Sequence, residues 1–400
     1  MIFPSQTFVY VINFCLKREC ERKRGMMAEE RRRAVDKEQQ ILRYIRENPF
    51  ISQQELADKM GISRSAVAGY IAQLTKRGEI KGRAYVLRDE GRIVCIGGAN
   101  LDRKARGKQK VRLHSSNPVT ITESCGGVAR NIAENLGRLG SSVTLISCVG
   151  EDKEGEWILQ ETKRHGVDVS QVWRLPARRT GTYTALLDID GEMVVSLANM
   201  DIYDALTPEM FADKWSHIAA ARAVFLDTNL PAECLAYIIE RCRTESIPLF
   251  VDPVSSAKAK KLPERLDGVD AILPNREEAE LLAGMPIASV EECAEACRRI
   301  RERGVKRVVV TMGEQGVYYQ SAEQAEHLAP YPTDVVDVTG AGDAFASGLL
   351  YGIVNGESFG QACRLGLAAS ALTLQTEQSV SPLLQPEQLA QTVRQYEKER

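Results

Sequence analysis

The most informative string in the chain spans residues 337–345 and reads Asp337-Val338-Thr339-Gly340-Ala341-Gly342-Asp343-Ala344-Phe345. A run that is compatible with a helix, 346–354, follows it. Glycines let backbone come close to a ligand, and free N–H groups at a helix start can bind an anion. An aspartate in a first helical turn also has a plain structural reading, because the helix dipole favours it. The full string favours phosphoryl transfer, with oriented amides for phosphate and Asp343 as the base for a hydroxyl.

Short apolar runs predict the sheet that carries this string. Each run is followed by turn residues and then by a segment with helical periodicity. This alternation is typical of a doubly wound, mostly parallel α/β sheet, in which ligands bind at the carboxyl ends of the strands. The runs are 93–96, 143–149, 223–226, 249–251, 271–273 and 308–310.

Length and composition narrow the class of protein. A chain of 400 residues predicts two or three domains, and 44% hydrophobic with 26% charged residues excludes a collagen, a disordered chain and a disulfide-rich mini-protein. Ten cysteines without a C-x-x-C pair and four scattered histidines argue against a zinc site. Cys293 and Cys297 are predicted to lie on one helix face, where they only fill space in the core. Free thiols at this density predict a cytoplasmic protein.

The N-terminal apolar stretch does not predict a membrane segment. Residues 8–16 form it, far short of the roughly 20 needed to span a bilayer, and no basic segment precedes it. We therefore expect no membrane partner. A start codon placed too early would produce such a prefix, so residues 1–33 are predicted to be an extension that is disordered or non-native.

Charge divides the chain into two parts. The net charge is −2, yet residues 1–92 hold 19 basic and 12 acidic residues, and the remainder hold 33 and 42. This asymmetry predicts parts with different partners. Residues 1–25 hold five of those basic and two of the acidic residues, so the case for nucleic-acid binding depends more on helix spacing than on charge.

Residues 35–45 have helical periodicity, which ends at Asn48-Pro49. Ser52 and Glu55 predict a capping box for a helix over 53–60. Gly61 turns the chain, Ser63 caps a third helix over 64–77, and residues 80–87 alternate like a hairpin.

This order of elements resembles a winged helix-turn-helix domain over residues 34–90. The resemblance is carried by Ile51-Ser52-Gln53-Gln54-Glu55-Leu56-Ala57 and Gly61-Ile62-Ser63-Arg64-Ser65-Ala66-Val67. It implies that the third helix enters the major groove of DNA. Lys76, Arg77, Lys81 and Arg83 would then lie near phosphates. A helical bundle for protein contacts is the alternative. The residues implied to face base edges are Ser63, Arg64, Ser65 and Tyr70.

The main part, residues 91–400, resembles the phosphofructokinase-B (ribokinase-like) family of carbohydrate and nucleoside kinases. The string 337–345 resembles one family signature, and a second one is Gly126-Gly127-Val128-Ala129-Arg130-Asn131-Ile132-Ala133 with Leu136-Gly137-Arg138-Leu139-Gly140. The resemblance covers residues 92–385 and implies a phosphotransferase with an alcohol acceptor. No G-x-x-x-x-G-K-[ST] string occurs, so P-loop chemistry is not the alternative.

The resemblance implies roles for particular residues around the acceptor. Asp343 would be the catalytic base, and the amides of Gly340, Ala341 and Gly342 would bind the developing anion. A carboxylate suits paired hydroxyls because it accepts two hydrogen bonds. The alternatives are a role as a turn residue or helix cap for Asp102, and close packing of helix on strand for Gly126 and Gly127. The implied substrate-binding residues are Asn100, Asp102, Gly126, Gly127 and Asn131.

The resemblance also implies ATP and Mg²⁺ as cofactors. Asn275 and Glu278 match an N-x-x-E element that would organise Mg²⁺, which prefers oxygen ligands and retains waters. The alternative is a capping asparagine with a solvated glutamate. A monovalent cation such as K⁺ near Asp337 and Thr339 is also common in the family. The residues implied for the nucleotide, besides Asn275, are Thr311, Gly313 and Gly316.

Two inserts, 103–124 and 181–200, resemble the β lid of the family. A lid excludes water that would compete as phosphoryl acceptor. The lid also mediates dimerisation in many relatives, so we expect a homodimer.

Several strings resemble the pseudouridine kinase branch of the family, among them 116–118, 127–136, 187–193, 227–229 and 251–255. They imply phosphorylation of a nucleoside 5′-hydroxyl. Ala129 stands where that branch has glycine, and Ser115 stands where it has aspartate. Another riboside, ribose or a related sugar therefore stays open. A regulator that uses the kinase fold only to sense a ligand is a further alternative, against which the intact catalytic string argues.

Overall fold

The computed structural model describes residues 37–46, 51–80 and 91–398. The chain divides into two compact units, residues 1–88 and 89–400, which are taken one at a time below. The predicted extension, 1–33, lies outside the described residues, as does most of the predicted wing, 80–87.

The N-terminal unit contains the three predicted helices: residues 37–46, α2 (Gln53–Met60) and α3 (Arg64–Lys76). The predicted capping box is confirmed, since Ser52 Oγ accepts from Glu55 N and Glu55 Oε2 accepts from Ser52 N. Ser63 caps α3 by accepting from Ala66 N. Apolar positions at helical spacing form the small core, which includes Ile41, Ile45, Leu56, Val67, Ile71 and Leu74.

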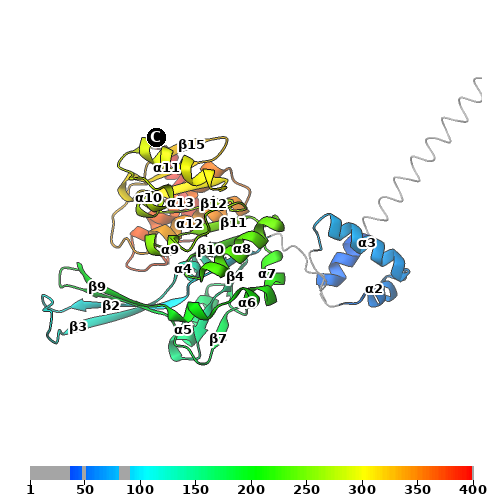
Figure 1. Ribbon diagram of the computed structural model, residues 1–400, viewed down its shortest axis with the longest axis horizontal. Coiled ribbons are helices and arrows are strands. Elements are labelled where there is room, and N and C mark those ends of the chain that lie inside the picture. The colour runs from blue at the N-terminus through cyan, green and yellow to red at the C-terminus, as the bar shows by residue number, and fades with distance from the viewer. Residues whose placement is uncertain (1–36, 47–50, 81–90, 399–400) are drawn as a thin grey trace, which may run out of the picture. The chain divides into compact units, whose positions relative to one another are not determined.

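The second unit is built on a nine-stranded sheet, the doubly wound, mostly parallel sheet that was predicted (Figure 1). All neighbours pair in parallel except at one edge, where β14 runs antiparallel to β13 and β15. The strands in spatial order are β15 (Ala325–Leu328), β14 (Val317–Gln320), β13 (Arg307–Thr311), β12 (Ala271–Ile272), β11 (Leu249–Asp252), β10 (Ala223–Asp227), β1 (Ile93–Ile96), β4 (Val143–Ile146) and β6 (Val167–Asp168).

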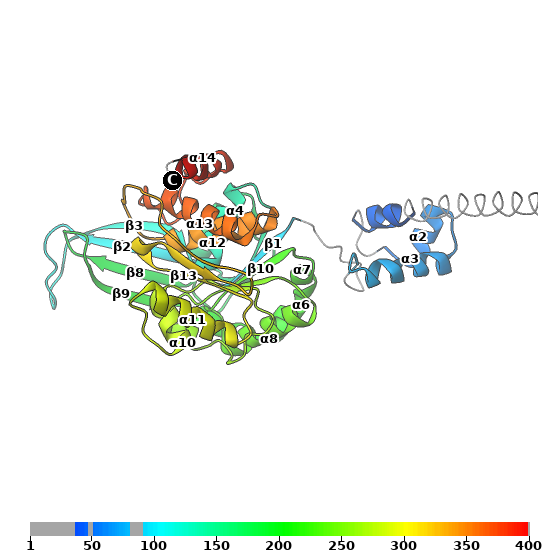
Figure 2. The same ribbon diagram turned by 90° about the horizontal axis from the view of Figure 1, so that it is seen from above.

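Helices cover both faces of this sheet (Figure 2). Strand side chains alternate between two cores: Ile93 and Cys95 of β1 belong to one, and Val94 and Ile96 belong to the other. On the first face lie α4 (Val128–Arg138), α5 (Lys153–Arg164), α12 (Ala341–Val354), α13 (Phe359–Leu374) and α14 (Pro386–Lys398). On the second lie α6 (Pro208–Asp213), α7 (Trp215–Ala219), α8 (Ala232–Thr244), α9 (Ser256–Ala259), α10 (Arg276–Ala283) and α11 (Val290–Glu302).

One predicted strand is in fact two. The run 143–149 leaves the main sheet after Ile146, and β5 (Cys148–Gly150) pairs instead with β7 (Trp173–Leu175). Ser147 occupies the break, where its hydroxyl donates to the carbonyl oxygen of Gly97 at 2.6 Å. β4, Ser147 and β5 are all buried. The run is therefore similar in composition on both sides of the break, and the sequence does not indicate that the chain changes sheet there.

The two predicted inserts form a separate four-stranded sheet, drawn at the lower left of Figure 1. Its strands are β3 (Val119–Gly126), β2 (Asn100–Gly107), β8 (Thr182–Leu187) and β9 (Met193–Asn199), in that order. We call this sheet the lid. Each residue of β9 is exposed, including Met193 and Leu197.

The cysteines behave as the sequence predicted. The eight described ones are free and buried, and Cys293 and Cys297 both lie on the buried face of α11, in the core. In the described segments, no helix has the length and apolar character that crossing a membrane requires.

Candidate functional site

Two segments more than 200 residues apart in sequence meet at the start of α4 and α12. These helices pack together, and the Asn131 Nδ2 group donates to Asp343 Oδ2 at 2.7 Å. The two strings that carry the family resemblance are therefore joined by a direct hydrogen bond. This contact defines the candidate active site.

Asp343 has an unusual electrostatic environment for a carboxylate. Its pKa is raised to about 7, chiefly by burial; the negative charges of Asp227 and Asp102 also raise it, while the Asn131 hydrogen bond and the Arg130 charge lower it. A carboxylate with a pKa near neutrality is suited to general base catalysis, because it can both hold and release a proton at working pH. Asp343 lies in the first turn of α12, as predicted.

The predicted hydroxyl-binding groups lie at the root of the lid. Asn100 Nδ2 donates to Asp102 Oδ1 at 2.6 Å, and the Asp102 carboxylate lies over Gly126, where a Cβ atom would overlap it. Burial raises the pKa of Asp102 to about 6. The Asp102 carboxylate also lies near enough to Asp343 for the two charges to interact. Asp102 is thus neither a helix cap nor a turn residue but part of strand β2.

At two of the predicted glycines, Gly127 and Gly340, the backbone conformation itself requires glycine. Gly127 and Gly340 cap α4 and α12 with φ of 99° and 81°, in the left-handed region that disfavours side chains. A Cβ atom would overlap the Gly98 carbonyl in one case and the Ser379 carbonyl in the other. The first-turn amides of α12 lie where a helix leaves N–H groups without intrahelical partners, and the Ala341 N–H donates outside the helix, to the Val338 carbonyl at 3.3 Å.

A fully buried aspartate that sequence reasoning had not placed in the site holds these loops together. Asp227, at the end of β10, accepts from Gly98 N at 2.7 Å and from Ala129 N at 3.0 Å through one oxygen. Its other oxygen accepts from the backbone and side chain of Asn229, both at 2.9 Å. The sequence contained a signal, since Asp227 follows a predicted strand, but nothing in the sequence pairs it with residues 98 and 129.

The N-x-x-E element has a structural role in helix capping. Asn275 caps α10, and its Oδ1 accepts from Glu278 N, while both Glu278 oxygens accept from Asn275. The alternative of a capping asparagine is therefore observed, but Glu278 is only 3% exposed and is not solvated. Burial raises its pKa.

A further carboxylate, Asp252 at the end of β11, lies near Glu278 and Asp343. Burial raises its pKa, and the charges of Glu278 and Asp343 raise it further. Uncompensated negative charge of this kind suits a divalent cation. The described residues contain no group of three or more histidine, cysteine or acidic side chains able to hold a metal alone. Mg²⁺ at kinase sites takes one or two carboxylates and completes its shell with water and phosphate, so these residues fit it.

The predicted nucleotide segment borders this element. Thr311 ends β13, its N–H donates to the Pro274 carbonyl at 3.0 Å, and it bridges to Asn275. Gly313 and Gly316 follow on either side of a short 3-10 turn (η2, Gly313–Gln315) with φ of 58° and 80°. The structure therefore brings Thr311 beside Asn275, and Gly313 and Gly316 lie in the turn that follows Thr311.

A lysine of the lid contacts the catalytic string. Lys104 Nζ donates to Asp337 Oδ2 at 2.6 Å and lies 3.4 Å from Thr339 Oγ1. The Lys104 ammonium group therefore lies beside the Asp337 carboxylate, near which the family resemblance implies a monovalent cation. The contact also connects strand β2 to the loop that leads into α12.

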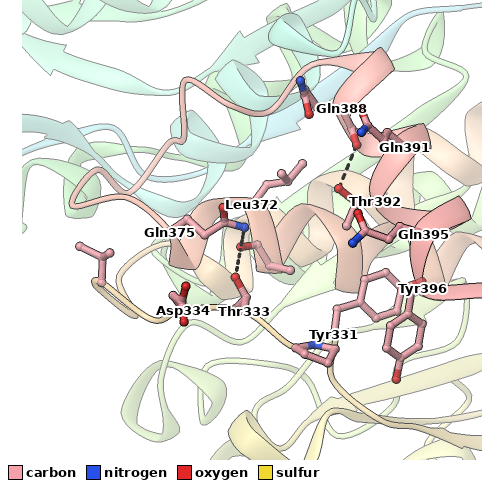
Figure 3. Close-up of a pocket in the computed structure, with 13 residues that line it drawn as sticks. Tyr331, Thr333, Asp334, Leu372, Gln375, Gln388, Gln391, Thr392, Gln395 and Tyr396 are labelled. Carbon is pink, nitrogen blue, oxygen red and sulfur yellow. Dashed lines mark hydrogen bonds between the residues drawn. The ribbon is translucent and has the colours of Figure 1, made fainter. Parts of the chain in front are cut away.

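A cavity of about 580 Å³ lies between α14, the end of α13 and the loop over 331–336 (Figure 3). Glutamine and threonine side chains dominate its lining, and Gln375 and Thr333 both donate to the Ala371 carbonyl. None of the predicted site residues lines it. The clustered carboxylates, rather than cavity size, therefore define the candidate site.

In the N-terminal unit, the predicted DNA-facing residues divide into two kinds. Ser63, Arg64 and Ser65 are exposed at the start of α3, and the two serine hydroxyls lie 3.0 Å apart. Tyr70 is half-buried and packs on the small core, so much of its ring is used within the unit.

Comparison with known proteins agrees with both units. Residues 90–386 match the model of the pfkB family of carbohydrate kinases, and residues 36–81 match a winged helix-turn-helix DNA-binding model. The fold is similar to a putative sugar kinase from Clostridium perfringens (TM-score 0.69, 29% identity, covering 77% of this chain and 97% of that one).

Two curated relatives come from Escherichia coli K12. The uncharacterized sugar kinase YeiI is 35% identical, covering 84% of this chain and 93% of its own length, and the pseudouridine kinase is 36% identical, covering 74% and 94%. The guanosine-inosine kinase of Exiguobacterium acetylicum is 30% identical, covering 73% and 97%. The chain therefore belongs to the pfkB family of carbohydrate kinases, as a sugar or nucleoside phosphotransferase with an alcohol acceptor, a ribokinase-like fold and an N-terminal winged helix-turn-helix domain.

Proposed function

We propose that this enzyme transfers a phosphoryl group from ATP to the 5′-hydroxyl of a nucleoside, and that the nucleoside is pseudouridine. The observation that carries the proposal is the hydrogen bond from Asn131 to Asp343, a half-buried carboxylate whose pKa is raised to about 7 and which lies in the first turn of α12. The 36% identity to a pseudouridine kinase supports the choice of substrate.

In this proposal each group has one task. Asp343 accepts the proton of the attacking hydroxyl, and Asn100 and Asp102 bind other hydroxyls of the sugar. The amides of Gly340, Ala341 and Gly342 stabilise charge on the phosphoryl oxygens. Gly126 and Gly127 let the sugar approach the backbone.

The nucleotide side is assigned to the loops near α10. Thr311, Gly313 and Gly316 contact the nucleotide, and Asn275, Glu278 and Asp252 hold Mg²⁺ directly or through water. When bound, Mg²⁺ neutralises phosphate charge. A monovalent cation near Asp337 stays a prediction. The eight described free thiols agree with a reducing compartment, so the proposal includes a cytoplasmic location.

The two departures from the pseudouridine kinase pattern do not oppose this substrate. Ala129 is fully buried, packs in the core and donates its N–H to Asp227, so its methyl group takes part in packing. Ser115 is exposed in the loop between β2 and β3. Neither residue presents a new side chain to the carboxylates of the site.

An ADP-release screen tests the proposal. We expect kcat/KM for pseudouridine to exceed that for uridine, inosine, cytidine and ribose by about 10-fold or more, because a site built for particular hydrogen bonds rejects analogues that lack them. Asp343→Asn serves as the background control. Turnover of fructose phosphates without turnover of any nucleoside would contradict the substrate.

We also propose that the N-terminal unit binds DNA through the start of α3, which makes the chain a kinase with a regulatory role. The exposed side chains of Ser63, Arg64 and Ser65 at a helix N-terminus support this, since such groups contact bases and phosphates. A sensor without kinase activity is the second candidate function, and it requires the screen above to show no turnover.

Fluorescence anisotropy with a mixed-sequence DNA duplex tests this binding. We expect affinity to fall steeply as salt rises, because binding releases counterions. Arg64→Ala should weaken binding about 10-fold, whereas Arg43→Ala, an exposed arginine of the first helix that stacks on Tyr44, should change it less than about twofold. Absence of binding by the full chain at low salt would contradict the proposal.

We further propose a homodimer formed through the lid. Strand register places Ile121, Ala105, Leu186 and Val195 in one row on one face, and Ile121 and Val195 are 58% and 44% exposed. Such an exposed apolar row indicates an interaction surface. Analytical ultracentrifugation should show a dimer that Val195→Lys weakens, and a wild-type monomer at micromolar concentration would contradict the assignment.

A further inference from the structure

Arg130 is a buried charge at the entrance of α4 that the mechanism above does not use. Only 2% of the residue is exposed. Its guanidinium donates to Asn131 Oδ1 through Nη2 at 2.7 Å and Nε at 3.2 Å, and to Glu134 Oε2 through Nη1 at 2.7 Å. Burying a guanidinium is expensive unless its donors are used, and here three are used.

Pairing with Glu134 does not by itself account for Arg130. Glu134 is also buried, and its other oxygen accepts from Arg138 Nε at 3.0 Å and Nη2 at 2.8 Å. Glu134 therefore has a cationic partner without Arg130. The second partner distinguishes the two arginines: Arg130 donates to Asn131, whereas Arg138 Nη2 lies 3.1 Å from His165 Nε2, away from Asn131.

The chemistry of the groups determines the direction of the Asn131 amide. A guanidinium has donors and no acceptor, so the amide must turn its oxygen toward Arg130. The amide nitrogen then points the other way and donates to Asp343 Oδ2 at 2.7 Å. With Arg130 absent, the amide could rotate and present its oxygen to the Asp343 carboxylate, which would be repulsive.

We infer that Arg130 is a positioning residue for phosphoryl transfer, which holds the Asn131 amide so that its N–H group orients Asp343 toward the acceptor hydroxyl. This inference rests on the proposed function, in which Asp343 is the base. Arg130 itself contacts Asn131 and Glu134 and not the reacting atoms.

The charges around Asp343 set the expected pH effect. Asp102 from β2, Asp227 from β10 and Asp252 from β11 are negative groups near Asp343, and Arg130 from α4 is a positive one. Both the Asn131 hydrogen bond and the Arg130 charge lower the pKa of Asp343. Removing Arg130 should therefore raise that pKa, and the acidic limb of the kcat/KM profile should move to higher pH.

Arg130→Met and Arg138→Met form a matched pair, because both remove an arginine of α4 that pairs with Glu134. On the alkaline plateau, where Asp343 is ionised, we expect Arg130→Met to lower kcat with the nucleoside by 10- to 100-fold, as misplacement of a reacting group does. Arg138→Met should keep kcat and the position of the acidic limb. Equal effects of the two substitutions would overturn the inference in favour of general helix stabilisation.

A double-mutant cycle with Asn131→Ala identifies the route of the effect. If Arg130 acts through Asn131, Arg130→Met should cause no further loss of plateau kcat in the Asn131→Ala background. Multiplying effects would overturn the inference. If Arg130→Met does not fold, the cycle is run with Arg130→Lys, which keeps the charge but loses the planar fork. Failure of the proposed function is distinguishable, since Asp343→Asn would then retain turnover whatever the cycle shows.

Discussion

Asp343→Asn is expected to lower kcat by between roughly 10²- and 10⁴-fold, the range that a positioned general base contributes. The amide has nearly the shape of the carboxylate and its oxygen can still accept from Asn131 Nδ2, so the contact between α4 and α12 should persist. What is lost is the ability to take a proton. The KM for ATP should change little, and steady-state kinetics with the best substrate of the screen would measure both.

The stability of this variant should change in the opposite sense from its activity. Burial raises the pKa of Asp343 to about 7, so the folded state binds this proton more tightly than the unfolded state does. The contribution of the protonated carboxyl to stability is fully present below the ordinary aspartate pKa of 3.8, and it is lost as pH rises from there to about 7, where the folded carboxyl ionises. At pH 8 the asparagine variant should melt at the same temperature as the wild type or higher.

Thermal unfolding at pH 6 and pH 8, combined with kinetics, separates a base from a structural residue. Asp334→Asn is the matched control, because Asp334 is an exposed carboxylate three residues before the catalytic string. That control should keep its kcat. A lower melting temperature of Asp343→Asn at both pH values, with loss of kcat in proportion to loss of folded protein, would contradict the role of a base.

The wild-type enzyme should show the same group in its pH profile. With the ionised carboxylate as the proposed base, kcat/KM should rise with pH and level off above about 7. The acidic limb should disappear in Asp343→Asn, whose residual rate does not depend on that ionisation.

Local pattern was sufficient to predict most of this fold. The strands β1, β10, β11 and β13 lie within a residue or two of the predicted runs, because buried parallel strands are short and continuously apolar. The helix caps at Ser52 and Ser63 were predictable for a similar reason, since a cap depends on a side chain and an amide three residues away.

Relations between distant segments were not predictable in the same way. The strings that contain Asn131 and Asp343 could each be recognised, but their hydrogen bond joins residues 212 apart in sequence. The roles of Asp227 and Arg130 depend on which atoms the fold places around them. The change of sheet at Ser147 was hidden because burial makes both sides of it equally apolar.

Asn275 and Glu278 show a different limit. A capping box and a magnesium-organising pair would use the same two residues at the same spacing, so the sequence offered them as alternatives. The structure shows the capping box, and the magnesium role stays a proposal. Glu278 takes part in the capping box, is buried and lies near Asp252. Local spacing could not reveal this combination.

The second large effect is expected at two glycines of the string 337–345. Gly340 and Gly342 differ in whether the structure leaves room for a side chain. Gly340 has a φ of 81°, and a Cβ atom there would overlap the Ser379 carbonyl. Gly342 has helical backbone, is exposed, and a Cβ atom there would meet nothing within 4 Å. The same substitution at the two positions therefore separates backbone strain from ligand contact.

Gly340→Ala should damage both fold and catalysis. A left-handed alanine costs about 1–2 kcal/mol before the overlap with Ser379 is counted, so the melting temperature should fall by a few degrees. The turn that aims the first amides of α12 must also shift. Loss of an aimed amide costs about 10²- to 10³-fold in kcat, and we expect a loss of that order.

Gly342→Ala should leave the free enzyme intact and weaken only the complex with nucleotide. Alanine favours a helix over glycine by about 1 kcal/mol, so thermal unfolding of the free protein should be unchanged or slightly later. The added methyl group would stand in the space where the proposal puts the transferred phosphate, and the KM for ATP should rise. If Gly342→Ala instead kept wild-type kcat and KM, the phosphate could not lie against this turn, and Asp343 would have to act on a hydroxyl held elsewhere.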